Sequence, residues 1–353
     1  MKKILIFFLL LCYSNIIFSQ SLHVEMVSVL PRGFVKNGSV DYTQLIQKFI
    51  NENNNVIFPD FPILINDSGL KLKSNSTYRF GKNSKLIMKP SDKTGYNMLD
   101  CNGKENITIT NPVLVGDRNL HKGNTGEWGF GISIRGARNI TVNGAKIYDC
   151  FGDGIYIGRL NQSISDNITI SNAFVSNSRR NGISITSGTN IKVISSTFQK
   201  SNGKGPSSGI DIEPNNAQDE LKNIELRNIQ TINNENWGLL INLVNLRKDN
   251  SVDKRISISI DNLIDSGSKY GMSFWLNRKN NYSKNIKGNI TINNLKLMNS
   301  IADPIKFYDT YDNDINLTFN GIRVDSENYQ KLKNSIRSYQ KESKIKFNKI
   351  ENN

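Results

Sequence analysis

The chain has 353 residues, and its 45 lysines and arginines outnumber its 31 aspartates and glutamates, which gives a formal charge of +14. Only 37% of the residues are apolar and the mean hydropathy is −0.43, which excludes a multispanning membrane protein. A charged fraction of 22% and an aromatic fraction of 9% are ordinary for a globular chain and argue against disorder. A basic chain has three usual partners: nucleic acid, an anionic membrane surface or an acidic polymer.

The first twenty residues have the pattern of a secretory signal. Lys2 and Lys3 precede an apolar run from Ile4 to Cys12, which is shorter than the roughly 20 residues of a membrane span. We therefore expect residues 1–20 to be a signal peptide and the protein to be secreted or periplasmic, without stable membrane insertion. Its removal lowers the charge to +12, and export makes nucleic acid the least favoured partner.

The next segment predicts an amphipathic helix. Within residues 41–52, apolar side chains recur at helical spacing, and Asp41 is placed as the N-cap; these side chains are Tyr42, Leu45, Ile46, Phe49 and Ile50. A strand begins at Val56. A helix in this position covers the open apolar end of a stacked fold.

An internal repeat follows, in which a glycine begins a short run of alternating apolar residues. Its copies are Gly131-Ile-Ser-Ile, Gly154-Ile-Tyr-Ile, Gly182-Ile-Ser-Ile, Gly209-Ile-Asp-Ile, Gly238-Leu-Leu-Ile and Gly271-Met-Ser-Phe. A second phased element lies between them: Asn139-Ile-Thr-Val, Asn167-Ile-Thr-Ile, Asn190-Ile-Lys-Val, Asn223-Ile-Glu-Leu, Arg255-Ile-Ser-Ile and Asn289-Ile-Thr-Ile. Each unit holds two or three short strands and no crossover helix, which predicts an all-β parallel solenoid. Asparagine suits its tight corners because it tolerates left-handed backbone.

The solenoid is expected to be one domain, residues 21–325. The Lys- and Ser-rich stretch beyond it, residues 326–353, forms either a helical cap or a solvated tail. Two cysteines follow the signal, Cys101 and Cys150, and they could form a disulfide or be separate core residues. We expect a monomer.

The order of these segments resembles the pectate-lyase-like family of right-handed parallel β-helix proteins. The resemblance rests on the helical stretch from Gly38 to Ile50, on Val56-Ile-Phe-Pro59 and on the phased Gly-Ile and Asn-Ile-Thr-Ile rungs, and it extends from about Val27 to Asp325. It implies a right-handed parallel β-helix with an N-terminal capping helix, and an extracellular protein that acts on carbohydrate. It leaves the reaction open, because this scaffold carries several chemistries.

Alternation along the Gly-Ile strands predicts one outward face. The first outward column is Ser133, Tyr156, Ser184, Asp211, Leu240 and Ser273, and the second is Arg135, Gly158, Thr186, Glu213, Asn242 and Trp275. Small residues around a few large polar ones suggest a groove. The turns before the strands add Glu127, Trp128, Asp153, Arg179 and Arg180 beside it. An arginine pair next to carboxylates suits binding of uronate or sulfate groups.

Two reactions fit these residues, and the substrate in each case is a polysaccharide, preferentially an acidic one. We expect β-elimination first, with the arginines neutralising a uronate and Tyr156 moving the proton. Glycoside hydrolysis by Asp211 and Glu213, whose carboxyls strand geometry places roughly 7 Å apart, is the alternative. A Ca²⁺ ion held by Asp153, Asp211 and Glu213 is a possible cofactor.

Two further observations bear on these alternatives. The chain carries neither the Asp-Asp plus Gly-His-Gly arrangement of polygalacturonase-like hydrolases nor the Asp-Pro-His-Glu element of alginate epimerases. Exposed tryptophans, with Trp275 the best placed, could instead stack on sugar rings in a glycan-binding surface protein that has no catalytic activity. If the protein is an enzyme, Glu127, Trp128, Arg135, Arg179, Asn242 and Trp275 are expected to bind substrate, and the catalytic candidates are Asp153, Tyr156, Arg180, Asp211 and Glu213.

Overall fold

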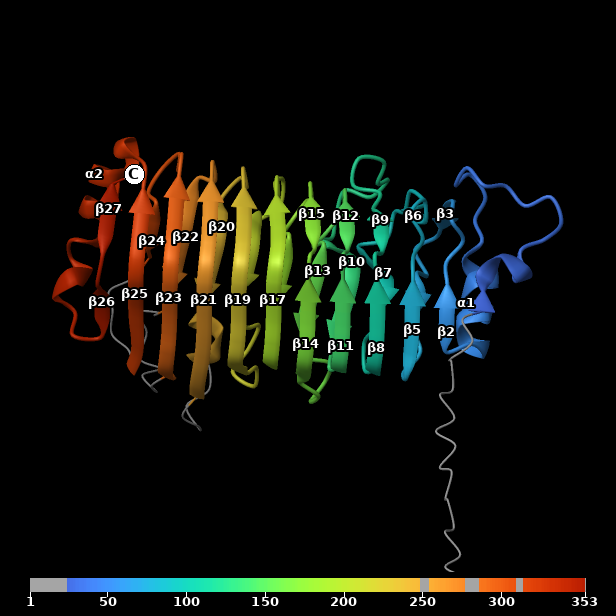
Figure 1. Cartoon of the computed structure of the whole chain (residues 1–353), viewed down its shortest axis with the longest axis horizontal. Helices are drawn as coiled ribbons and strands as arrows, with labels where there is room; N and C mark the ends of the chain where they lie inside the picture. The colour runs from blue at the N-terminus through green and yellow to red at the C-terminus, as the bar shows by residue number, and fades with distance from the viewer. Residues whose placement is uncertain (1–23, 248–253, 277–285, 309–313, 353) are drawn as a thin grey trace, which may run out of the picture.

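The fold is a parallel β-helix, seen in a computed structural model that describes residues 24–247, 254–276, 286–308 and 314–352. Successive coils stack side by side along one long axis, with α1 at one end and α2 at the other (Figure 1). Every pairing between the named strands is parallel, and the strands form two sheets. The expected all-β solenoid is confirmed. The expected signal, residues 1–20, lies outside the described residues.

The smaller sheet contains the Gly-Ile strands, one from each coil. It consists of β4 (Leu70–Lys71), β7 (Gly95–Asp100), β10 (Trp128–Arg135), β13 (Ile155–Gly158), β16 (Ile183–Ile185), β18 (Ser208–Ile212), β20 (Trp237–Asn242), β22 (Tyr270–Trp275) and β24 (Ile305–Phe307). Its register pairs Ile132 with Ile155, Ile155 with Ile183 and Ile183 with Ile210. These isoleucines are completely buried, so the predicted inward column is confirmed.

The larger sheet contains the remaining strands of every coil. In its N-terminal half these are β1 (Val24–Glu25), β2 (Asn55–Ile57), β3 (Pro62–Ile65), β5 (Ser76–Arg79), β6 (Lys85–Met88), β8 (Glu105–Thr110), β9 (Val113–Val115), β11 (Arg138–Asn143), β12 (Lys146–Tyr148), β14 (Ser165–Ser171) and β15 (Phe174–Ser176). The longer strands that follow are β17 (Gly188–Gln199), β19 (Leu221–Ile232), β21 (Lys254–Ser266), β23 (Ile286–Met298) and β25 (Asp314–Val324). Asn139, Asn167, Asn190 and Asn223 have φ values of 54°, 54°, 54° and 55°, as expected of left-handed corners.

Both ends of the solenoid are covered. At the N-terminal end α1 (Thr43–Glu52) buries Ile46, Phe49 and Ile50, after a short 3₁₀ turn, η1 (Met26–Val29). The N-cap prediction was wrong by one position, because the helix is capped at Tyr42 while the Asp41 carboxylate accepts the Thr43 N–H at 3.0 Å. Leu45 is 39% exposed and faces away from the core.

The C-terminal segment packs on the far end. Asp325 caps α2 (Ser326–Ile336), which buries Leu332 and Ile336. After η3 (Tyr339–Lys341), β26 (Ile345–Phe347) and β27 (Ile350–Asn352) pair with β25. One further 3₁₀ turn, η2 (Val244–Arg247), follows β20. Residues 326–352 therefore form a cap, and Cys101 and Cys150 are free, separate core residues without a disulfide.

The carboxyl group of Asp265 lies inside the solenoid. Asp265 is completely buried, and its Oδ1 accepts hydrogen bonds from Thr231 at 2.8 Å and Ser268 at 2.6 Å. Residue 238 has to be glycine here, because a Cβ would lie 2.2 Å from that oxygen. Burial raises the pKa of Asp265 to about 7.

This raised pKa predicts a pH-dependent stability. Between about pH 4 and pH 7 the folded state binds more protons than the unfolded chain, so the free energy of unfolding falls as the pH rises. Asp265→Asn removes this titration, and we expect the stability of the variant relative to the natural protein to rise by up to about 3 kcal/mol from pH 5 to pH 8. Urea denaturation at both pH values measures the difference. An equal difference at both would contradict the prediction.

Candidate functional site

The candidate site lies on the outer side of the smaller sheet. The register aligns Ser133 with Tyr156, Tyr156 with Ser184 and Ser184 with Asp211, which confirms the first predicted column. Its small members are not open to solvent as expected: Ser133, Ser184 and Asp211 are at most 1% exposed. Longer polar side chains bond across them, so these residues form the floor of the site.

An ion pair lies at the centre of this floor. Asp153, in the turn before β13, is completely buried and accepts bonds from Arg180 Nη1 at 2.9 and 3.2 Å, one to each carboxylate oxygen. Ser184 Oγ donates to the same carboxylate at 2.7 Å and the Asn181 N–H at 3.1 Å. Burial raises the pKa of Asp153, and the Arg180 guanidinium opposes that rise.

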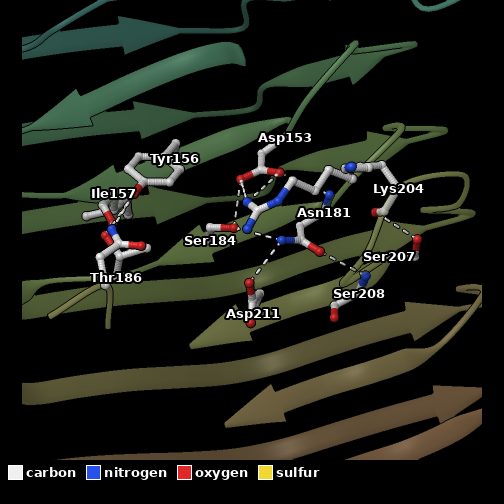
Figure 2. Close-up of polar contacts among 12 residues, drawn as sticks. Asp153, Tyr156, Ile157, Asn181, Ser184, Thr186, Lys204, Ser207, Ser208 and Asp211 are labelled. Atoms are coloured by element: carbon white, nitrogen blue, oxygen red, sulfur yellow. Dashed lines mark hydrogen bonds and ion pairs between the residues drawn. The ribbon is translucent and has the colours of Figure 1, made fainter. Parts of the chain in front are cut away.

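Asn181 connects this pair to the next coils. Figure 2 shows Asp153, Ser184, Asn181 and Asp211 following one another across the sheet. The Asn181 side-chain amide donates to Ser184 Oγ and to Asp211 Oδ2, each at 3.0 Å, and its oxygen accepts the Ser208 N–H at 2.9 Å. The bonds fix Asp211 relative to Asp153, two rungs away.

Asp211 and Glu213 are neighbouring carboxyl groups: Asp211 lies on β18, and Glu213 directly follows the end of that strand. Burial and the charge of Glu213 raise the pKa of Asp211 well above its usual range, and burial also raises the pKa of Glu213. Because like charges oppose each other's ionisation, the two groups hold their first shared charge more readily than a second one. Glu213 is the more exposed member and accepts from Asn242 Nδ2 at 2.6 Å.

The two adjacent arginines point to different places. Arg180 is surrounded by carboxylates: burial works against its charge, but Asp153, Asp211, Glu127 and Glu213 outweigh this and raise its pKa. Arg179 instead donates to the Gly126 carbonyl at 2.8 Å and lies over the Phe151 ring at 4.4 Å. It therefore holds the turn that carries Glu127 rather than facing the acid pair.

Tyr156 and Arg135 form a second polar group on the same face. The Tyr156 hydroxyl accepts from Asn215 Nδ2 at 2.9 Å and from Thr186 Oγ1 at 3.2 Å. The Arg135 guanidinium lies 5.7 Å from the Tyr156 ring centroid. Gly158 makes room for this group, because a Cβ there would lie 2.4 Å from Thr186 Oγ1 and 2.9 Å from the Tyr156 ring.

Aromatic side chains lie toward both ends of the face. Trp128 on β10 is 52% exposed, and its neighbour Glu127 faces Lys204 at 4.0 Å. Trp275 on β22 is 38% exposed and stacks on Tyr308 at 5.4 Å between ring centroids. Trp237 donates its indole N–H to the Tyr308 hydroxyl at 3.1 Å. One aromatic surface therefore adjoins the coil that carries Asn242.

The expected Ca²⁺ ligands do not form a metal site. Within the described ranges no three acidic, histidine or cysteine side chains are grouped as ligands. Asp153 is bonded to Arg180, Ser184 and Asn181, so its oxygens are already occupied. The described residues therefore give no support to a Ca²⁺ ion held by these three carboxylates.

Sequence reasoning missed the bridging roles of Asn181, Asn215 and Tyr308. Asn181 could have been found, because it precedes Gly182 as Asp153 precedes Gly154 and so belongs to the same column. Asn215 and Tyr308 follow their strands in loops of irregular length, where no repeat predicts the direction of a side chain. None of the helices in the described ranges combines the length and hydropathy needed to span a bilayer.

Comparison with known proteins supports the fold and leaves the family open. No family model matches the chain. Two uncharacterized proteins of Bacillus subtilis strain 168 are similar: YclG is 36% identical over 169 residues, 42% of this chain and 29% of YclG. The SPbeta prophage-derived YorA is 28% identical over 162 residues, 41% of this chain and 28% of YorA. The matched region thus spans less than a third of either relative.

Three solved structures illustrate the similarity in fold. A tailspike protein of E. coli bacteriophage HK620, in complex with a hexasaccharide, has a TM-score of 0.65 at 12% identity, with coverage of 87% of this chain and 58% of the tailspike. The A-module of the Azotobacter vinelandii mannuronan C-5 epimerase AlgE6 follows at 0.59 and 13%, covering 85% and 75%. An exopolygalacturonase of Thermotoga maritima reaches 0.57 and 15%, covering 86% and 83%. At such identities the similarity establishes the parallel β-helix, and the pectate-lyase-like family is still a resemblance.

Proposed function

We propose that the protein is an exported enzyme that hydrolyses glycosidic bonds in a polysaccharide. The observation that carries this proposal is the neighbouring carboxyl pair of Asp211 and Glu213, in which burial raises the pKa of both groups. Strongly perturbed carboxyl groups of this kind concentrate at catalytic sites. A carboxylic acid that stays protonated near neutral pH is what glycoside hydrolysis needs to protonate the leaving oxygen.

Access assigns different roles to the two members of the pair. Asp211 is 1% exposed and cannot contact a polymer, so it acts as a positioning residue that shares its proton. Glu213 is the member that substrate can reach, and it delivers that proton as the general acid. Hydrolysis requires a second carboxylate to activate water or attack the sugar. We assign this role to Glu127, whose side chain is 28% exposed and whose charge acts on the same Arg180.

The solved structures of similar fold are compatible with this proposal. The HK620 tailspike holds a hexasaccharide, and the Thermotoga maritima protein is an exopolygalacturonase. Trp128 and Trp275 offer exposed rings on which sugars can stack, toward the two ends of the face. The formal charge of +12 after signal removal favours an acidic polysaccharide.

Elimination is the second candidate function, and it uses the polar group formed by Tyr156 and Arg135. It would place a uronate carboxylate against Arg135 while Tyr156, held by Asn215 and Thr186, moves the proton. The remaining arginines support it less, because Arg180 is bonded to Asp153 and Arg179 to the Gly126 carbonyl. We therefore rank hydrolysis ahead of elimination, the reverse of the order expected from the sequence.

A panel of polysaccharides separates these functions. We expect new reducing ends from at least one acidic polymer, with no ultraviolet absorbance from an unsaturated product. An ultraviolet absorbance that rises together with the reducing ends, and that is lost in Tyr156→Phe, would show that the reaction is elimination and not hydrolysis. Retained binding on affinity gels without any product would leave a glycan-binding surface protein and contradict both enzymatic proposals.

A further inference from the structure

A groove with a volume of about 660 Å³ lies on the larger sheet, away from the acid pair. Its volume is in the range of ligand sites. It crosses β19, β21, β23, β25 and β27, the neighbouring coils toward the α2 end in Figure 1. Four rung spacings make it about 19 Å long. It is lined by Asn228, Asn262, Ile264, Asn294, Leu295, Lys296, Asn320, Gly321, Arg323, Asn348, Lys349 and Glu351.

Rows of asparagine amides form one side of this groove. Asn262 donates to Asn228 at 2.9 Å, and Asn320 donates to Asn293 at 2.9 Å. A primary amide has two N–H groups and each of these bonds uses one, so every donor keeps a second N–H for a ligand. The rungs repeat every 4.8 Å or so, which presents these donors in a line along the solenoid axis.

The charged side chains of the groove favour an anionic occupant. Three cations line it, Lys296, Arg323 and Lys349, against one carboxylate, Glu351. Arg323 and Lys349 both bind Glu351, at 3.0 and 2.7 Å, and so neutralise it. Lys296 has no ion-pair partner within the described ranges. The cations therefore leave a net positive field over the row of amide donors.

An apolar contact completes the site. Ile264 is 40% exposed, although Leu263 and Asp265 on either side of it are buried. A pyranose ring presents a face of C–H groups as well as hydroxyl and carboxylate oxygens, so it can contact an exposed aliphatic side chain while its oxygens accept hydrogen bonds. A linear chain of such rings also matches the line of donors and the length of the groove.

We propose that this groove is a second binding site, which takes a strand of an acidic, uronate-containing glycan. The site has no coupled carboxyl pair among its lining residues, so it binds without cleaving. It lies on a different sheet from Asp211 and Glu213, and it could hold a polymer to the protein while another stretch of the polymer occupies the acid site.

Calorimetric titration of the full chain with an oligogalacturonate and with its carboxyl-reduced, neutral analogue tests the proposal. The Glu213→Gln variant is used throughout, which prevents turnover and makes the measurement independent of the proposed hydrolysis. We expect Lys296→Glu combined with Lys349→Glu to weaken binding of the acidic probe about tenfold. Lys192→Glu, an exposed lysine on β17 of the same sheet outside the groove, is the matched control and should change little.

Three outcomes would overturn the proposal. Equal loss in the groove variant and in Lys192→Glu would show only a general charge effect. Equal affinity for the acidic and neutral probes would remove the role of the cations. If Trp275→Ala abolishes binding and the groove variant leaves it intact, the glycan binds at the acid site alone.

Discussion

Glu213→Gln is expected to lower kcat by about 10²- to 10⁴-fold, the usual contribution of a general acid. The substitution keeps the shape of the side chain and an oxygen that can accept the Asn242 bond, which is 2.6 Å in the natural protein. Only the ability to hold and release a proton is lost. Reducing-end assays on the most active polymer of the panel measure the change. Glu225→Gln on β19, a partly exposed glutamate of the larger sheet, is the matched control.

The pH profile distinguishes the role of Asp211 from that of Glu213. Activity of the natural protein should fall at high pH, when the pair loses its last proton. The raised pKa of Asp211 moves the pH of this fall to a higher value. In Asp211→Asn the proton of Glu213 is no longer shared. The fall in activity should therefore occur at a lower pH, while activity at acid pH is retained. Unchanged kcat in Glu213→Gln, or an unshifted limb in Asp211→Asn, would contradict the proposed mechanism.

Arg180→Met is expected to destabilise the protein by about 3–5 kcal/mol at pH 8, the cost of removing one partner of a buried ion pair. Asp153 is completely buried and would lose its only cationic hydrogen-bond partner among the residues that the structure describes. The loss should be smaller at pH 5, because burial raises the pKa of Asp153 and allows it to become neutral. Urea denaturation at the two pH values measures both effects.

A double variant tests the cause of that destabilisation. Asp153→Asn in the Arg180→Met background removes the stranded charge and should restore most of the stability at pH 8. Arg227→Met is the control, since Arg227 is 47% exposed and pairs with Glu225 at 3.5 Å on the surface; its loss should stay below about 1 kcal/mol. A loss of equal size at both pH values, without rescue in the double variant, would show that packing rather than charge is responsible.

The fold was predictable because its signal is repeated. The coils that begin at Gly131, Gly154, Gly182 and Gly209 each supply, in the same order, a glycine, two inward isoleucines and an asparagine corner. Strand alternation then assigns the inward column without knowledge of any partner, and stacking in register aligns Tyr156 with Ser184 and Ser184 with Asp211. The columns of the candidate site follow from the same register.

The site itself was predictable only as a neighbourhood. The repeat placed Asp153, Arg180 and Asp211 near one another, but it could not show that Asn181 would bridge them or that Arg179 would turn away to the Gly126 carbonyl. A backbone repeat specifies where Cβ atoms lie, whereas long polar side chains choose among rotamers according to the donors and acceptors within reach.

The sequence alone determines the local and periodic properties. The parallel β-helix, its inward isoleucines and the net positive charge all depend on composition and spacing. Burial of the outward column, the raised pKa values of Asp211 and Glu213, and the groove around Lys296 depend on which side chains the neighbouring coils place beside each residue. Desolvation and hydrogen bonding act through these three-dimensional neighbours, which are separated by about 30 residues in sequence, as Asn181 and Asp211 are. For that reason one carboxylate, Asp153, is paired with Arg180, while another, Glu213, lies beside a second carboxyl group and is the one we propose as the proton donor.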